Sequence, residues 1–247
     1  MNKMFYGFAL SLMLCLVFVP AAFAGACTEG MSGTTVFAAG FSCTIGDEVF
    51  SDFSYQGTGS NPVTTSELVV NAVGPTSDGF SAAYYSSSPG LQFNAPWDAT
   101  AGETSDAAIG FQVNTNDGAD LFTDFGLAQT AGVTAPGLAE VAETGCGPAT
   151  CTPTGGPLDV MTFNAGGTSY SQQNETAFTG VTSVDVIKDI TASGGTNGSG
   201  GFASISIVQD TFSETPTAVP EPASVSLLGF GLLAGFGLFK RLRSTQS

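Results

Sequence analysis

Short stretches in which apolar and polar residues alternate recur along the chain. The clearest are residues 48–55, 109–113 and 203–207, and shorter apolar stretches occur at 68–73, 80–85, 138–143, 158–163 and 181–190. Alternation with a period of two predicts β-strands that bury one face. Turn-forming residues gather at 56–62, 114–118 and 193–201. Many short strands at this spacing predict an all-β fold, a single antiparallel β-sandwich or jelly roll, over residues 25–213.

An apolar run near the N-terminus does not follow this alternation. Residues 5–19 are apolar, Lys3 precedes them, and Ala22-Phe-Ala24 follows. A positive charge, an apolar run and an A-x-A site are typical of a secretory signal peptide. We therefore predict a signal peptide at residues 1–24, with the Sec translocon and signal peptidase as partners.

A second long apolar run lies near the C-terminus. Residues 223–239 carry no charge, and Lys240, Arg241 and Arg243 follow directly. A run of this length can span a bilayer as a transmembrane helix, and the basic tail 240–247 would then stay in the cytoplasm. Pro220 and Pro222 cannot lie inside a helix, so the helix should begin after them. Residues 214–222 are predicted to form an extended stalk between the domain and the membrane.

The three-part C-terminus resembles a known sorting signal. Val219, Pro220, Glu221 and Pro222, followed by the apolar run and the basic tail, resemble the PEP-CTERM signal of Gram-negative bacterial surface proteins. The resemblance implies that exosortase, a membrane protease, recognises residues 219–222. It also implies that the three basic residues retain the precursor in the inner membrane before the protein reaches the cell surface or extracellular matrix. An association with exopolysaccharide and biofilm follows from the same resemblance. The alternative is an ordinary membrane anchor.

The exported body is strongly acidic. Apart from Glu221 it holds 20 acidic residues and a single basic residue, Lys188. Such a charge repels nucleic acid and anionic lipid headgroups, so we exclude nucleic acid as a partner. Acidic residues also keep an extracellular protein soluble, and we favour this interpretation over a selected cation-binding role.

Cleavage of the signal peptide would remove Cys15. Four cysteines then remain: Cys27, Cys43, Cys146 and Cys151. An even number in an exported chain predicts two disulfides, for which three pairings exist. Proximity in the sequence favours Cys27–Cys43 and Cys146–Cys151. The alternative for Cys27 is lipidation, because residues 24–27 resemble a lipobox, although such boxes usually carry leucine where this chain has Ala24. The chain has no histidine and no C-x-x-C spacing, which disfavours a zinc site.

Two segments hold candidate binding residues. Oxygen ligands for calcium are offered by Asn114, Asn116, Asp117, Asp120 and Asp124. Their spacing does not fit an EF-hand, and Asp117-Gly118 also suits a tight hairpin turn, so we expect no cofactor, with calcium as the alternative. Trp97 is the single tryptophan and a candidate for stacking on a sugar from a loop, although we favour a buried aromatic in the core or at its rim.

The absence of histidine excludes several classes of enzyme. It excludes the usual serine and cysteine triads and histidine acid–base catalysis. Our hypothesis is a non-enzymatic, exported surface or matrix protein. The alternatives are a carbohydrate-binding module that uses a loop around Trp97 and, third, a glycosidase that uses paired carboxylates.

Overall fold

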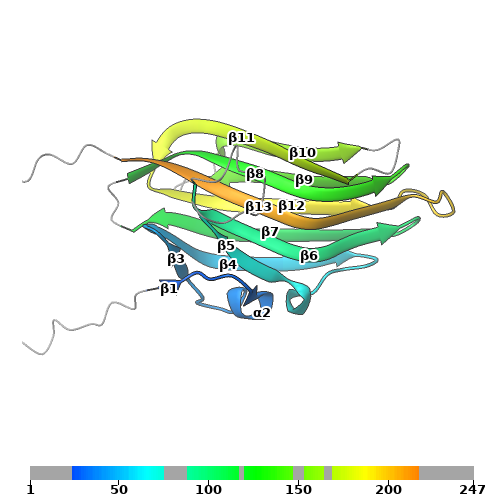
Figure 1. The fold of residues 1–247 in the computed structure, drawn as a ribbon, viewed down its shortest axis with the longest axis horizontal. Coiled ribbons are helices and arrows are strands. Elements are labelled where there is room, and N and C mark those ends of the chain that lie inside the picture. The colour runs from blue at the N-terminus through cyan, green and yellow to red at the C-terminus, as the bar shows by residue number, and fades with distance from the viewer. Residues whose placement is uncertain (1–23, 75–87, 117–119, 147–152, 164–168, 217–247) are drawn as a thin grey trace, which may run out of the picture.

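The computed structural model describes residues 24–74, 88–116, 120–146, 153–163 and 169–216, which form two facing β-sheets (Figure 1). The strands are β1 (Gly25–Ala26), β2 (Met31–Ser32), β3 (Cys43–Ile45), β4 (Glu48–Gly59), β5 (Val69–Val73), β6 (Gly90–Thr100), β7 (Thr104–Thr115), β8 (Asp120–Thr134), β9 (Leu138–Cys146), β10 (Pro153–Phe163), β11 (Ser169–Val181), β12 (Ser183–Ser193) and β13 (Phe202–Pro216). A one-turn helix, α2 (Gly33–Val36), and a 3-10 turn, η1 (Thr65–Glu67), lie between the early strands. The predicted β-sandwich is confirmed.

The order of the strands is that of a jelly roll. One sheet has the order β1-β3-β4-β7-β12-β9-β10 and the other β11-β8-β13-β6-β5-β2. From β6 to β13 the chain changes sheet at every step except between β9 and β10. The pairs are antiparallel, except that β1 and β3 are parallel. The eight strands β6–β13 form the jelly roll, and the strands before β6 extend each sheet at one edge.

The core between the sheets is rich in phenylalanine. In β7 the alternating residues Ala107, Ile109, Phe111 and Val113 are buried, as a strand with one inward face requires. The rings of Phe50, Phe111 and Phe212 meet with centroids 6.0 to 6.2 Å apart. Full burial of each such side chain contributes about 1.5–3 kcal/mol, so this cluster is a principal source of the stability of the sandwich.

The strands are longer than the alternating pattern predicts. β4 runs to Gly59 through part of the predicted turn 56–62, and β13 runs to Pro216, three residues into the predicted stalk. β6, β8 and β11 were not predicted, because residues such as Gly126, Ala128 and Thr130 give no clear periodicity. β8 forms a strand because it is hydrogen-bonded to β11 on one side and to β13 on the other, although its own residues do not alternate clearly.

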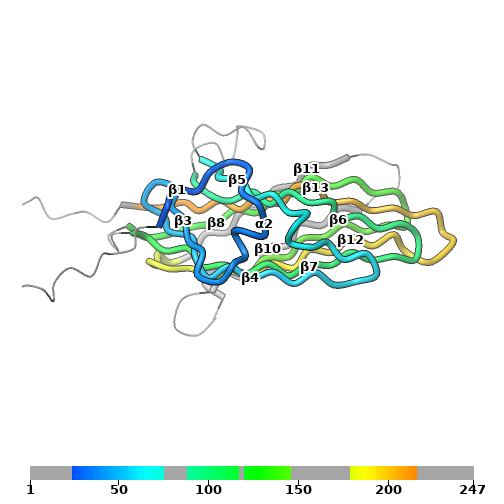
Figure 2. Tube along the Cα trace, turned by 90° about the horizontal axis from the view of Figure 1, so that it is seen from below, coloured from blue at the N-terminus to red at the C-terminus, as the bar shows by residue number. Residues whose placement is uncertain are grey.

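The predicted elements at the two ends of the chain fall outside the described residues. These are the signal peptide 1–24 apart from its last residue, the transmembrane helix 223–239 and the basic tail 240–247; the predicted strand 80–85 is outside them too. Among the described residues, no helix is long and apolar enough to cross a membrane. β1 and the C-terminal end of β13 lie toward the same end of the sandwich in both views (Figures 1 and 2).

Candidate functional site

The sorting motif begins three residues after the last described strand. Val219, Pro220, Glu221 and Pro222, and the basic residues Lys240, Arg241 and Arg243, lie outside the described residues. β13, which leads to them, is a central strand that pairs with β6 on one side and with β8 on the other. The chain therefore leaves the body along β8, which pairs with β13 as far as Pro216, whereas the ladder with β6 ends at Thr211.

Three carboxylates gather where β13 ends. Asp47 precedes β4, Asp120 opens β8, and Glu214 lies near the end of β13. Their carboxylate oxygens lie within 4.8 Å of one another, with Asp47 exposed and the other two half-buried. Asp120 and Glu214 come together because β8 and β13 pair, and the backbone N–H of Asn116 donates to the Asp47 carbonyl at 2.7 Å. The cluster therefore lies where the two sheets meet at this end of the sandwich.

The predicted oxygen-ligand segment is not brought together as one loop. Asn114 lies in β7, where its amide donates to Gln112 at 2.8 Å, and Asp124 lies within β8. Asn116 follows β7 and is exposed, and Asp117 is outside the described residues. Asp120 joins Asp47 and Glu214 instead, two residues that no local motif marks. Because Ca²⁺ takes about six to eight oxygens, three carboxylates do not define a site, and calcium stays an alternative to the predicted lack of a cofactor.

Glu48 lies next to this cluster and is fully buried. It opens β4, opposite Thr115 of β7, and within the described residues neither carboxylate oxygen has a hydrogen-bond partner. Burial raises the pKa of Glu48 to about 10, and the nearby Glu214 and Asp47 carboxylates add to the increase. At neutral pH, Glu48 is therefore protonated in the folded protein and ionised in the unfolded chain.

We expect the body to become more stable as the pH falls from 7 to 5, because the folded state binds a proton at Glu48 that the unfolded state releases. Between the unfolded and folded pKa values the free energy of unfolding changes by about 1.4 kcal/mol per pH unit, or about 3 kcal/mol over these two units. Glu48→Gln should reduce this pH dependence, measured by urea unfolding at both pH values. Replacing the exposed Glu29 by glutamine is the control. An unchanged slope in Glu48→Gln would contradict the assignment.

A second group of charged residues lies in the centre of the core. Lys188 of β12 contacts Glu143 of β9 and Asp210 of β13, and all three side chains are fully buried. Lys188 and Glu143 are direct cross-strand partners in one sheet, whereas Asp210 belongs to the other sheet. The three residues therefore form an ionic bridge between the sheets.

The protonation of this triad follows from its burial. Burial raises the pKa of Glu143 well above its usual range, the charge of Asp210 adds to this, and Lys188 opposes it. Burial by itself lowers the pKa of Lys188, but Asp210 and Glu143 outweigh burial, so the pKa of Lys188 is raised. At neutral pH Glu143 is therefore protonated, and Lys188 keeps its positive charge in contact with Asp210.

This triad was not predicted, although the sequence holds a signal for the burial of Lys188. Lys188 is the single basic residue of the body, and it lies in phase with Val186 and Ile190 on the inward face of β12. A lysine at an inward position of a strand predicts a buried partner, since an unpaired charge is costly in a core. Nothing in the sequence indicates that the partners are Glu143 and Asp210.

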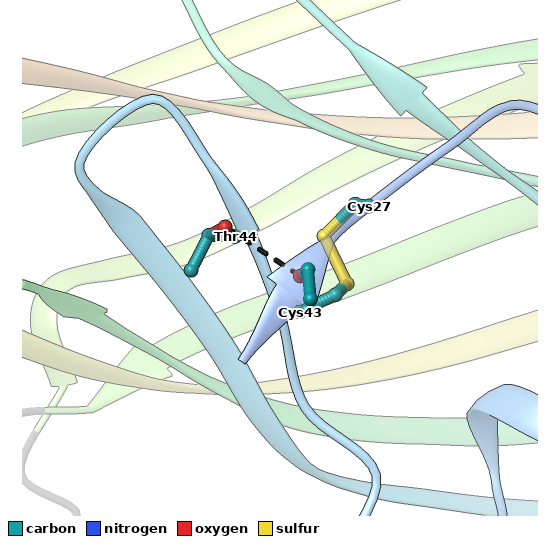
Figure 3. The surroundings of a disulfide bond; sticks show 4 residues. Cys27, Cys43 and Thr44 are labelled. Carbon is teal, nitrogen blue, oxygen red and sulfur yellow. Dashed lines mark hydrogen bonds between the residues drawn. A yellow bond between two sulfur atoms is a disulfide. The ribbon is translucent and has the colours of Figure 1, made fainter. Parts of the chain in front are cut away.

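The disulfide Cys27–Cys43 confirms the first predicted pair (Figure 3). It closes a separation of 16 residues next to β1, and the backbone N–H of Cys27 donates to the Thr44 carbonyl at 2.9 Å. Because its sulfur is bonded to Cys43, Cys27 in this structure is not available for lipidation. Cys151 and the side chain of Cys146 lie outside the described part of the chain, so the second pair stays a prediction.

The favoured interpretation of Trp97 as a buried aromatic is confirmed, and the alternative position on a loop is not observed. Trp97 is in β6, opposite Ile205 of β13, and its side chain is 0% exposed. Its ring faces the core, where the burial of a large aromatic surface is most favourable. In this position Trp97 cannot stack on a sugar.

Comparison with known proteins identifies the C-terminal signal. Residues 218–241 match the PEP-CTERM protein-sorting motif. The resemblance stated from the sequence is therefore confirmed for the tail, and the motif implies a membrane-anchored precursor that exosortase processes for export. No match was found among curated proteins.

Several solved structures have distant likenesses to the body. The enzymatically active domain of tailspike protein 4 from bacteriophage CBA120 is 12% identical, with a TM-score of 0.32, over 75% of this chain and 21% of that one. This chain thus spans about a fifth of the tailspike domain. A carbohydrate-binding module of Cellvibrio mixtus lichenase 5A is 11% identical, with a TM-score of 0.25, over 59% and 87%. A xylan-binding domain from Paenibacillus barcinonensis is 8% identical, with a TM-score of 0.24, over 67% and 87%. Likenesses at these scores carry no argument about function.

Proposed function

We propose that this chain is an exported protein of a Gram-negative bacterium that exosortase processes and that then acts without catalysis at the cell surface or in the extracellular matrix, in association with exopolysaccharide. The PEP-CTERM motif at residues 218–241 is the observation that carries this proposal. A dedicated sorting signal delivers the body outside the inner membrane, where a soluble and compact domain is required.

The attachment of the tail to the body supports a tethered role. β13 leads toward the sorting segment; it pairs with β8 as far as Pro216 and with β6 as far as Thr211. A force applied to the tail would act first on the ladder with β8 and then on a central strand that is paired on both sides. This arrangement suits a domain that is held at a surface while its remaining faces contact the matrix.

Two features favour a non-enzymatic role. The chain has no histidine, so the commonest acid–base and nucleophile-activating group is missing. In addition, Glu143 and Asp210, two carboxylates that meet, are fully buried with Lys188 and out of reach of a polymeric substrate. The carbohydrate-binding alternative loses its proposed platform because Trp97 is buried, so it would need other residues.

The test is the intact mass and location of the protein in cells that possess exosortase. We expect the protein outside the inner membrane, with an N-terminus near Gly25 and a C-terminus close to residues 220–222. A deletion of exosortase should leave a heavier species in the inner membrane. Full-length protein in the membrane of both strains would contradict the proposal.

A further inference from the structure

The position of Lys188 is unusual because the charged side chain of lysine is rarely fully buried. It lies in β12 between Ile109 of β7 and Glu143 of β9, and it is 0% exposed. Asp210, which it contacts, lies in β13 between Leu91 of β6 and Leu127 of β8, and is also 0% exposed. The amine and the carboxylate therefore meet in a dry core, each on a strand that has neighbours on both sides.

The two carboxylates occupy different positions relative to Lys188. Glu143 is the direct cross-strand partner of Lys188, so the two side chains extend from the same sheet side by side into the core. Asp210 approaches from the opposite sheet, and facing sheets lie about 10 Å apart. Lys188 bridges this gap, because its Nζ contacts both the Asp210 carboxylate of the opposite sheet and the Glu143 carboxyl of its own sheet.

We propose that Lys188 and Asp210 are joined by an intramolecular isopeptide bond, and that Glu143 is the catalytic residue that transfers the protons. The site is a modification site built into the core, and the two sheets of the jelly roll would be linked covalently. This inference does not depend on the proposed function.

The reaction balances within the triad. A proton passes from the Lys188 ammonium to the Asp210 carboxylate, with Glu143 as the relay, and the neutral amine attacks Asp210 Cγ. The Nζ–Cγ bond forms and one Cγ–O bond breaks. Nζ gives up its second proton through Glu143 to the departing oxygen, which leaves as water. Ammonium and carboxylate thus become an amide plus one water, Glu143 is regenerated, and no oxidant or other reagent is consumed.

The environment favours both the step and its product. Groups held in contact react as if present at very high concentration, and the surrounding apolar side chains exclude the water that would reverse the reaction. Burial raises the pKa of Glu143, so the proton needed for the relay is present at neutral pH. An ion pair in a core bears a large desolvation cost, whereas an amide is neutral, so bond formation removes two buried charges.

The chain offers a direct test, because Lys188 is the single lysine or arginine between residues 25 and 222. Trypsin requires a free basic side chain, so the denatured and reduced body can be cut after Lys188 only where no bond has formed. We expect the exported wild-type body to resist trypsin completely. After reduction, its intact mass should be lower by one water than the mass calculated for the uncross-linked chain. Digestion with another protease should yield a branched peptide that contains Lys188 and Asp210.

Variants separate the roles of the three residues. Asp210→Ala should restore cleavage by trypsin and the full mass. Most molecules of the Glu143→Gln variant should stay uncross-linked, because glutamine cannot relay protons. Asp189→Ala changes the exposed neighbour of Lys188 and should stay cross-linked.

The decisive measurement is on the wild-type protein, so it does not depend on whether a variant folds. Wild-type protein that has the full mass and is cut after Lys188 would overturn the proposal. A branched peptide that joins Lys188 to Glu143 would overturn the assignment of Asp210. If the Lys188–Asp210 bond forms as fast in Glu143→Gln as in the wild-type protein, Glu143 does not have the proposed role.

Discussion

Replacement of both Pro220 and Pro222 by alanine is expected to abolish processing and to leave a larger precursor in the inner membrane. Each proline should prevent the predicted transmembrane helix from extending upstream, so we expect residues 219–222 to stay extended and accessible at the outer surface of the membrane. With alanine at both positions the helix can continue through the motif, and a protease would meet backbone that is already hydrogen-bonded. Membrane fractionation and immunoblotting would measure the precursor and mature forms.

The basic tail provides a contrasting variant. Replacement of Lys240, Arg241 and Arg243 by glutamine should leave the motif intact but weaken the retention of the precursor before cleavage. Replacement of Pro216, which ends β13 and lies before the motif, by alanine is the matched control and should be processed normally. If full-length wild-type protein that still contains residues 223–247 is found on the surface of exosortase-containing cells, the tail is an ordinary membrane anchor and the prediction is wrong.

The second large effect is expected from Lys188→Met, which should lower the free energy of unfolding by about 3–5 kcal/mol relative to the form in which Lys188 is paired with Asp210 but not bonded to it. The substitution keeps much of the volume of lysine but leaves Asp210 and Glu143 together in the core without a cation. One carboxylate would then have to stay ionised without a partner or take up a proton at neutral pH, and either outcome costs free energy. Urea unfolding at pH 7 would measure the loss.

A triple variant with Lys188→Met, Glu143→Leu and Asp210→Leu tests the cause. Because a whole buried ionic group can be replaced by apolar side chains at little cost, we expect the triple variant to be more stable than Lys188→Met alone. The exposed Asp189→Ala change should have little effect. If Lys188→Met unfolds like the wild-type protein, the triad does not stabilise the core.

Features encoded by residues close together in the sequence were predictable. The sorting signal is one continuous segment whose prolines, apolar run and basic tail need no folded partner to be recognised. Cys27 and Cys43 are separated by 16 residues, so proximity alone favoured the pair. Strands such as β4 and β12 were found because the alternation of their side chains directly reflects one buried face.

Features that depend on strand pairing were decided only by the tertiary structure. Glu143 and Asp210 lie 45 and 22 residues from Lys188 and meet it across a strand pair and across the gap between the sheets. Asp47, Asp120 and Glu214 likewise meet because three strands begin or end at one end of the sandwich. The burial of Trp97 has the same origin, since its strand was not evident from periodicity. Local patterns determine which face of a strand is apolar, but the order of strands depends on the burial and hydrogen bonding of the whole chain, so distant side chains are brought together only by the complete fold.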